Sequence, residues 1–282
     1  MMNKRLLNGL MLKVFVLASL SISWVLNNDI QAQDLEKKLP LEGKTLVIGG
    51  SVAFIIPAQE QLQSADGQIP KSAKPWVWYA PTLPNLPGPE ERWMFERFVK
   101  AGVAIAGIDA GESYGSPKGN RVFDALYAEM IRQGYSKRPI LLGRSRGGLQ
   151  TLSWAADHPH QVAGWAGIYP VCNLASYPGL DRAAGAYELT AEELKKRLEE
   201  FNPIDRMGKL ALAKVPLFAI HGDVDKVVPL ELNSGLLKES YARANGPPLE
   251  LIVPSGQGHN MWEGFFQCQE LVDFVIKHAL KD

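Results

Sequence analysis

The chain lacks the features that would mark it for nucleic acid, metal or extensive cross-linking. Its 282 residues carry 30 basic and 30 acidic side chains, so no net charge is left to attract nucleic acid or an anionic surface. Its two cysteines and five histidines have no metal-ligand spacing, and no internal repeat indicates a solenoid. A content of 46% hydrophobic and 21% charged residues is that of a globular protein with one large, well-buried domain.

Long apolar runs are also missing, except near the N-terminus. Basic residues precede an apolar stretch at 14–26, and polar residues and then the small Ala32 follow it. This order predicts a secretory signal peptide, residues 1–32, cleaved after Ala32. The mature domain would then be residues 33–282 of a secreted or periplasmic protein. The stretch is shorter than the roughly 20 residues of a membrane span. Once it has been cleaved off, no membrane contact of the remaining chain is expected. An uncleaved N-terminal anchor is the alternative.

The two cysteines, Cys172 and Cys268, leave their redox state open. In an exported protein they could form one disulfide. Two buried free thiols fit the sequence equally well, because unpaired cysteine is among the most buried residue types. The oligomeric state is likewise not determined by the sequence.

Short apolar runs alternate with amphipathic segments along the rest of the chain. This alternation predicts an α/β fold, with a mostly parallel central sheet and helices on both faces. The expected strands are 45–49 and 52–56, as a pair, and then 76–79, 103–108, 140–142, 162–168, 217–221 and 249–253. The expected helices are 91–101, 122–133, 147–157, 230–244 and 261–280.

The interval 173–214 is longer than a connection between strand and helix requires. Within it, Thr190-Ala191-Glu192-Glu193 forms a capping box that is expected to open a charged helix at 194–200. The interval is interpreted either as a small cap insertion over an active site or as a solvated surface helix.

A Gly-x-Ser-x-Gly pattern follows the predicted strand 140–142. The residues Gly143-Arg144-Ser145-Arg146-Gly147-Gly148 join this strand to the helix 147–157. The pattern predicts a sharp turn with Ser145 at its apex, where the flanking glycines let strand and helix approach closely. Such a turn lifts the serine hydroxyl to where a base can reach it.

Two further strands end in polar loops. The first continues as His221-Gly222-Asp223-Val224-Asp225, and the second as Ser255-Gly256-Gln257-Gly258-His259. A serine alone is a poor nucleophile. It needs a histidine to take its proton, and that histidine needs a carboxylate to fix its tautomer. Serine, aspartate and histidine follow successive strands in the chain order of the α/β-hydrolases.

On these motifs the chain resembles the α/β-hydrolases, close to the dienelactone hydrolase and prolyl-oligopeptidase-like esterases. The resemblance extends from about residue 42 to the C-terminus. It implies Ser145 as nucleophile, Asp225 as acid and His259 as base, with no metal or cofactor. Asp223 is the weaker candidate for the acid, and is expected to bond its own turn backbone.

The other histidines are weaker candidates for the base. His158 and His160 lie in a turn after a helix, His278 lies on the terminal helix, and His221 is interpreted as a structural turn residue. Only His259 lies in a loop after the last strand.

An oxyanion hole requires two donors aimed at the developing negative charge. The Arg146 amide, directly after the nucleophile, is expected to be one. The second should follow strand 76–79, where Pro81 has no N–H, and Thr82 is preferred over Ala80. An arginine directly after the serine also resembles the glucuronoyl esterases, which implies a side chain that holds the oxyanion. The alternative is an ion pair of this arginine with Asp109 or Glu112.

Aromatic residues lie at or near the strand ends that should face the site. Tyr79, Tyr114 and Trp262 are therefore candidate substrate-binding residues, which would suit a sugar or an aryl ester. Their alternative role is in the core or the wall of the domain.

These expectations converge on an exported serine hydrolase that cleaves carboxylic esters through an acyl-enzyme. The expected substrate is a small-molecule or carbohydrate ester, with no nucleic acid partner. The alternatives are a prolyl-oligopeptidase-like peptidase and a catalytically inactive hydrolase fold used for binding. Acyl transfer to an acceptor other than water also fits the sequence.

Overall fold

An eight-stranded sheet forms the centre of the computed structural model, which describes residues 37–59 and 73–281. The predicted signal peptide lies outside these residues. The strand order is β1-β2-β4-β3-β5-β6-β7-β8. The strands are β1 (Lys44–Ile48), β2 (Ser51–Ile56), β3 (Trp76–Ala80), β4 (Ala104–Ile108), β5 (Ile140–Arg144), β6 (Gly164–Ile168), β7 (Leu217–Ile220) and β8 (Glu250–Ile252).

The predicted strands all appear, and the sheet is mostly parallel. β1 and β2 form the expected pair, which is antiparallel, and β2 is also antiparallel to β4. All pairs from β4 through β3 to β8 are parallel. The chain passes from β3 to β4 on one side and then returns to β5 on the other side of β3. The loops after β3 and β5 therefore diverge at the point where the strand order reverses, which is where open α/β sheets bind ligands.

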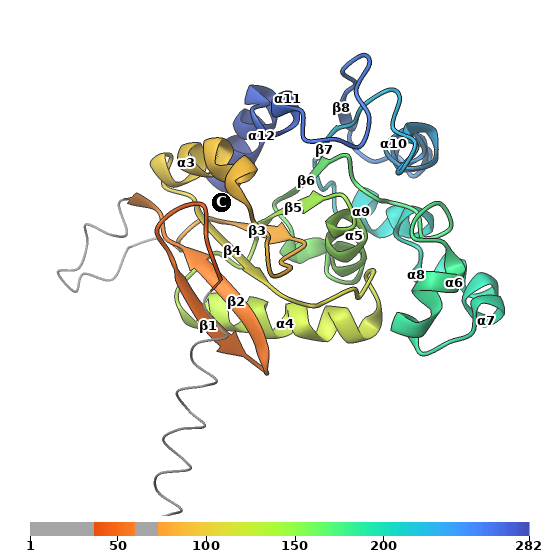
Figure 1. Cartoon of the computed structure of the whole chain (residues 1–282), viewed down its shortest axis with the longest axis horizontal. Helices are drawn as coiled ribbons and strands as arrows, with labels where there is room; N and C mark the ends of the chain where they lie inside the picture. The colour runs from red at the N-terminus through yellow and green to blue at the C-terminus, as the bar shows by residue number, and fades with distance from the viewer. Residues whose placement is uncertain (1–36, 60–72, 282) are drawn as a thin grey trace, which may run out of the picture. The chain divides into compact units, whose positions relative to one another are not determined.

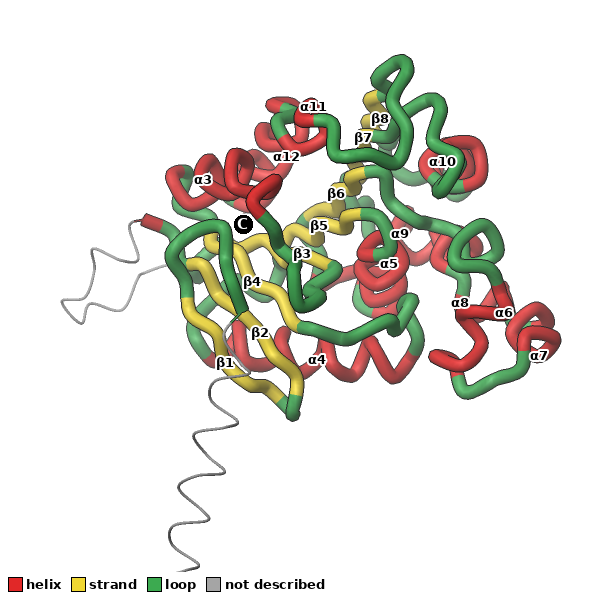
Figure 2. The backbone as a smooth tube through the Cα atoms, viewed as in Figure 1, coloured by secondary structure: helices red, strands yellow, loops and turns green. Residues whose placement is uncertain are grey.

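Helices cover both faces of the sheet (Figures 1 and 2). On one face α3, α11 and α12 pack with Phe54, Tyr79 and Phe218. On the other, α4, α5, α9 and α10 pack with Trp76, Trp78 and Trp165. The helices are α3 (Arg92–Lys100), α4 (Pro117–Arg132), α5 (Gly147–Asp157), α6 (Leu180–Ala183), α7 (Ala191–Lys196), α8 (Leu198–Phe201), α9 (Met207–Leu212), α10 (Ser234–Arg243), α11 (Glu263–Phe266) and α12 (Gln269–Ala279).

Three predicted helices differ from the structure by more than one residue at an end. α4 begins at Pro117 instead of residue 122, because Ser116 caps it by accepting from the Gly119 amide at 3.3 Å. The predicted helix 230–244 is interrupted at Asn233, and 261–280 is interrupted before Cys268. Cys268 caps α12 by accepting from the Leu271 amide at 3.4 Å, whereas the Asn233 side chain makes no cap bond and accepts from the Cys172 amide at 2.9 Å. Apolar periodicity contains no signal for either interaction.

The interval 173–214 folds into four short helices, α6 to α9. Thr190 caps α7 with the predicted capping box, but the charged segment divides into α7 and α8 at Arg197. Leu194 is the buried residue of α7, and the rest of that helix is largely solvated. Beneath the interval, Leu194 and Tyr187 pack with Leu149 at the start of α5.

Cys172 and Cys268 are both free and buried. Cys172 belongs to the core on the face of α4 and α5, whereas Cys268 belongs to the core on the opposite face of the sheet. Between the two possibilities that the sequence left open, the structure therefore has two buried thiols. Within residues 37–59 and 73–281, no helix is long and apolar enough to span a membrane.

Candidate active site

The turn after β5 holds Ser145 in a left-handed backbone conformation, with φ of +49°. The glycines around it leave room for close packing. A Cβ on Gly143 would lie 2.6 Å from the Thr151 hydroxyl, and one on Gly147 would collide with the Ala80 carbonyl. These residue types are therefore required by the approach of α5 to the strands, as the motif predicted.

Ser145, His259 and Asp225 lie together and are joined by hydrogen bonds. The Ser145 Oγ is 2.9 Å from His259 Nε2, and His259 Nδ1 is 2.8 Å from Asp225 Oδ2. Since an ionised carboxylate only accepts, the Nδ1–H donates to Asp225, and Nε2 is left to accept from the serine. The three residues come from the loops after β5, β8 and β7, all at the carboxyl edge of the sheet.

Asp225 is held in its ionised form. Burial by itself would raise its pKa, but hydrogen bonds from His221 and His259 outweigh burial and keep the pKa well below its usual range. The other carboxylate oxygen accepts from the Val227 and Val228 amides at 2.9 and 2.8 Å. Its charge and orientation are therefore fixed before any substrate binds.

Asp223, the weaker candidate for the acid, does not touch His259. The bond predicted to its own turn backbone is replaced by another: the Asp223 side chain accepts from the Gly256 amide at 2.6 Å. Gly256 belongs to the loop that carries His259, so Asp223 ties the loop of the acid to the loop of the base. Gly222 supports the same junction, since a Cβ there would collide with the Gln257 carbonyl.

His221 is fully buried and is bonded at both ring nitrogens. Nδ1 lies 2.8 Å from the Ser234 hydroxyl, and Nε2 lies 2.8 Å from the Val228 carbonyl. Its Nε2 is also 3.4 Å from Asp225. His221 therefore braces the turn that presents the acid, in line with the structural role predicted for it.

The two segments expected to supply oxyanion donors lie side by side. Arg146 is the N-cap of α5, so its amide is at the positive end of that helix. The segment after β3 packs directly on Gly147 through the Ala80 carbonyl and the Pro81 nitrogen. Thr82 follows in this segment, is buried, and turns its hydroxyl back to the Tyr79 carbonyl at 3.2 Å.

Both arginines that flank the serine are paired with carboxylates. Arg146 forms an ion pair with Glu112 in the loop after β4, one of the two partners expected for it. Asp109, the other, accepts from the Gly111 amide at 2.8 Å. Arg144 pairs with Glu91 at 2.6 Å, and the Glu91 side chain is completely buried.

The three candidate substrate-binding aromatics have different positions. Tyr79 is fully buried and donates its hydroxyl to Glu91 at 2.7 Å, so it belongs to the core and cannot line a binding surface. Tyr114 is partly exposed, and burial and then Glu112 raise the pKa of its hydroxyl. Trp262 is 40% exposed and lies three residues after the base. Tyr114 and Trp262 therefore stay available as wall residues.

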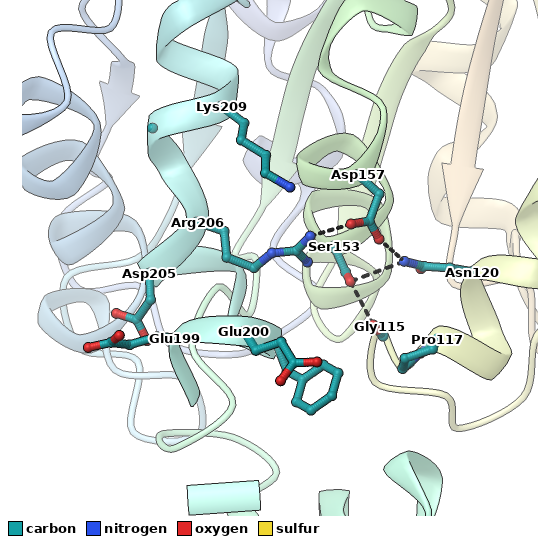
Figure 3. A pocket seen from close by; sticks show the side chains of 12 residues that line it. Gly115, Pro117, Asn120, Ser153, Asp157, Glu199, Glu200, Asp205, Arg206 and Lys209 are labelled. Carbon is teal, nitrogen blue, oxygen red and sulfur yellow. Dashed lines mark hydrogen bonds and ion pairs between the residues drawn. The ribbon is translucent and has the colours of Figure 1, made fainter. Parts of the chain in front are cut away.

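A cavity of about 710 Å³ lies away from these residues, between the starts of α4 and α9 and the end of α5. Figure 3 shows its wall, in which Arg206 reaches Asp157, and Asp157 accepts from Asn120 at 2.8 Å. Asn120 also donates to Ser153 at 3.3 Å. No member of the hydrogen-bonded set around Ser145 lines this cavity.

Sequence reasoning missed the contacts around Arg144. Its guanidinium lies between Glu91 and Tyr169, and the ring of Tyr169 packs against His259. Glu91 reads in the sequence as an ordinary helix-start acid after Gly88-Pro89. Nothing in the local pattern shows that Glu91 is buried and paired with Arg144, 53 residues away at the end of β5.

Comparison with known proteins places the chain among serine hydrolases. The model of the prolyl oligopeptidase family matches residues 119–280, which is more than half of the chain. No curated protein matches it.

Solved structures share the fold at low identity. Est1E from Butyrivibrio proteoclasticus is 17% identical with a TM-score of 0.62, and the match covers 86% of this chain and 100% of that one. The esterase domain of a Rhodothermus marinus protein is 18% identical with a TM-score of 0.59, over 85% and 100%. Porphyromonas gingivalis dipeptidyl peptidase 4 is 16% identical with a TM-score of 0.64, over 84% of this chain but 35% of that one.

Proposed function

Because the chain belongs to the prolyl oligopeptidase family of α/β serine hydrolases, we propose that it hydrolyses carboxylic esters through an acyl-enzyme on Ser145. The observation that carries this proposal is the unbroken set of hydrogen bonds from Ser145 through His259 to the ionised Asp225. Geometry of this kind activates a serine that would otherwise be a weak nucleophile.

The reaction follows from the donors and acceptors in place. His259 Nε2 takes the Ser145 proton as Oγ attacks the ester carbonyl carbon, and the imidazolium is stabilised by Asp225. His259 then gives the proton to the leaving alkoxide, so that an alcohol departs. A water molecule, deprotonated by His259, attacks the acyl-enzyme and releases the acid and the free serine. No metal or cofactor enters these steps.

We assign the oxyanion to the Arg146 amide and to a donor in the Thr82 segment. The Arg146 amide lies at the start of α5, next to the nucleophile, and the Thr82 segment packs against the same turn. Two such donors stabilise the negative charge that develops on the carbonyl oxygen. We do not assign the oxyanion to the Arg146 side chain, because its guanidinium is paired with Glu112.

The shares of the solved structures that this chain covers favour an ester substrate over a peptide. The two esterases match over their whole length, whereas the dipeptidyl peptidase matches over about a third of its own. The partly exposed ring of Tyr114 and the exposed ring of Trp262 would suit a sugar or an aryl group beside the scissile bond. A peptidase is the second candidate, because the family that matches is named for an oligopeptidase.

The test compares the mature chain from Gln33 with its Ser145→Ala variant on a short-chain aryl acetate and on an aminoacyl arylamide. We expect turnover of the acetate by the wild type, and a loss of about 10⁴-fold or more in the variant. Labelling by a fluorophosphonate should occur only in the wild type. Faster arylamide than acetate hydrolysis would identify a peptidase, and equal activity of both proteins would remove Ser145 as nucleophile.

We also propose export, on the basis of the N-terminal pattern alone. The test is expression of the full chain in a bacterial host, followed by fractionation and N-terminal sequencing. A protein outside the cytoplasm that begins at Gln33 would support cleavage after Ala32. Retention of residues 1–32 in the membrane fraction would show an anchor instead.

A further inference from the structure

Tyr169 packs against the imidazole ring of His259. The two ring centroids are 4.4 Å apart, and the planes are inclined by 57°. Tyr169 is only 2% exposed, so it lies beneath the base and is closed off from solvent. The hydrogen bonds of His259 occupy both of its nitrogens, and Tyr169 instead contacts the ring. The contact is therefore additional to Ser145 and Asp225.

The backbone of Tyr169 is in a conformation that is unfavourable for its residue type. Its φ is +33°, in the left-handed region where glycine is the usual occupant. Its amide donates to the Ile220 carbonyl at 2.7 Å, so the strained conformation is held in place by the neighbouring strand. Strain of this kind at a bulky residue concentrates at functional sites, where a particular side chain is needed.

Arg144 holds the other end of Tyr169. Its Nε donates to the Tyr169 hydroxyl at 3.1 Å, and its Nη1 donates to Glu91 at 2.6 Å. The guanidinium also lies over the ring of Phe266 at 4.9 Å. Burial raises the pKa of Tyr169 to about 12, which keeps its hydroxyl neutral at physiological pH. The tyrosine oxygen is thus a fixed acceptor for a fixed donor.

Glu91 in turn has no freedom to move. It is completely buried, accepts from the Tyr79 hydroxyl at 2.7 Å, and accepts from the Gly88 amide at 2.8 Å. A buried ion pair with its remaining acceptor sites filled keeps a single geometry. Glu91 at the start of α3 therefore fixes Arg144, and Arg144 fixes the Tyr169 ring that packs against His259.

We propose that Tyr169 is a positioning residue for His259, and that Arg144 acts through Tyr169. This inference rests on the proposed function. The tyrosine ring sets the plane of the imidazole, so that Nε2 stays directed at Ser145 while Nδ1 stays on Asp225. The ring contact, at 4.4 Å between centroids, keeps this orientation while His259 takes and returns the serine proton.

The kinetic test replaces Tyr169 with leucine or with phenylalanine and measures kcat and KM for an aryl ester. In Tyr169→Leu we expect kcat to fall by about 100-fold, the cost of a small misplacement of a catalytic group. KM should stay unchanged, because the buried ring cannot touch substrate. Tyr169→Phe keeps the ring but loses the Arg144 anchor, so its kcat should lie between those of Tyr169→Leu and the wild type.

The matched control is Tyr241→Phe. Tyr241 is also a fully buried tyrosine whose hydroxyl is hydrogen-bonded, here to the Val215 carbonyl, and it does not contact the candidate site. Its loss should lower the thermal midpoint but leave kcat unchanged. Circular dichroism of each variant confirms that the chain has folded. A kcat in folded Tyr169→Leu equal to that of the wild type would overturn the inference.

A second readout does not need turnover. The proton that His259 shares with Asp225 should give a downfield imidazole N–H signal in proton NMR. We expect this signal in the wild type and in Tyr241→Phe, and expect it to broaden or vanish in Tyr169→Leu. A wild type without esterase activity but with this pattern would refute the ester assignment and support the positioning. A signal unchanged in Tyr169→Leu would refute the positioning, whatever the substrate.

A double-mutant cycle tests the part played by Arg144. If Arg144 acts through the hydroxyl of Tyr169, then Arg144→Gln and Tyr169→Phe should not have additive effects on kcat. The double variant should be no slower than the slower single variant. Losses that multiply would show that Arg144 acts on the site by another route.

Discussion

Ser145 and Tyr169, the residues on either side of the His259 ring, both have backbones in the left-handed region. Their φ values are +49° and +33°, and each residue follows a parallel strand. Such conformations cost about 1–3 kcal/mol each and persist only where the surroundings fix them. One presents a hydroxyl to His259 and the other presents a ring. At the residue scale, the site is therefore held by local strain that close packing compensates.

Asp225→Asn should nearly abolish turnover. An amide at this position can donate to Nδ1, which favours the tautomer with its proton on Nε2, so His259 could no longer accept from Ser145. We expect kcat to fall by about 10⁴-fold with KM little changed. Steady-state kinetics checks this, with Asp223→Asn as control. An equal loss in that control would mean that the acid has been misassigned.

Asp225→Asn should also change how the stability of the fold depends on pH. The pKa of Asp225 is lower in the folded chain than its unfolded value of about 3.9. Its ionised form therefore stabilises the fold fully above about pH 4, and this contribution is lost as the pH falls from there toward the folded pKa. The difference in thermal midpoint between wild type and Asp225→Asn should shrink on acidification through this window. A difference that is constant down to pH 2 would contradict it.

Gly147→Ala should destabilise the protein, although it adds only a methyl group. The new Cβ would collide with the Ala80 carbonyl, and neither backbone can yield easily. We expect a loss of about 3 kcal/mol in the free energy of unfolding. Gly185→Ala is the control, since a Cβ there meets nothing within 4 Å. Chemical denaturation measures both, and comparable values would show that α5 can move away from β3.

At the scale of elements, the helices α6 to α9 are tied to the domain at defined points. Asn233, at the start of α10, accepts from the Cys172 amide at 2.9 Å and from the Ser176 hydroxyl at 3.1 Å. At the other end, Arg206 reaches Asp157 at the end of α5. These contacts join segments far apart in the sequence, so they position the interval 173–214 beside α5.

Arg206→Ala should loosen this interval. The Arg206 side chain is only 11% exposed, so the substitution removes packing as well as an ion pair with the partly exposed Asp157. We expect a loss of about 1–2 kcal/mol in unfolding free energy. Arg197→Ala is the control, since Arg197 and Glu200 are 44% and 55% exposed and solvent screens their ion pair, so this substitution should change the unfolding free energy much less. Equal losses would show that Arg206 does not anchor the interval.

At the scale of the molecule, the central sheet separates two apolar cores, and each core holds one cysteine. Burial raises the pKa of Cys268 to about 11 and that of Cys172 higher still. Neither thiol is therefore reactive near neutral pH.

The thermal midpoint should not respond to reducing agent. We expect it to change by less than about 1 °C with or without a reductant, because no disulfide is available to break. Thiol titration should find no reactive cysteine in the native protein and two after denaturation. A single modification-resistant pair in the denatured, unreduced protein would show that a disulfide had formed.

The fold class and the set of Ser145, Asp225 and His259 could be inferred from sequence because their signals are local. Each lies in a loop that follows a recognisable apolar strand, and the strand order of the fold brings those loops together. Helix ends were less accessible. Cys268 caps α12 through its side chain, and Asn233 ends a helical turn while its side chain bonds the distant Cys172 amide, and neither interaction leaves a trace in apolar periodicity. The substrate-binding role predicted for Tyr79 is wrong. Both faces of β3 are buried, so its sequence does not show which of its side chains, if any, reaches solvent.

The order of elements, the glycines that let α5 approach the sheet, and the grouping of Ser145, Asp225 and His259 can all be inferred from the amino-acid sequence alone. The buried pair of Glu91 and Arg144, the position of Tyr169 beneath the base, and the separation of the two cysteines become visible only in the folded chain. Strand and turn signals lie within a few neighbouring residues, so they can be recognised locally. Burial and ion pairing instead depend on segments that become neighbours only when the sheet has assembled.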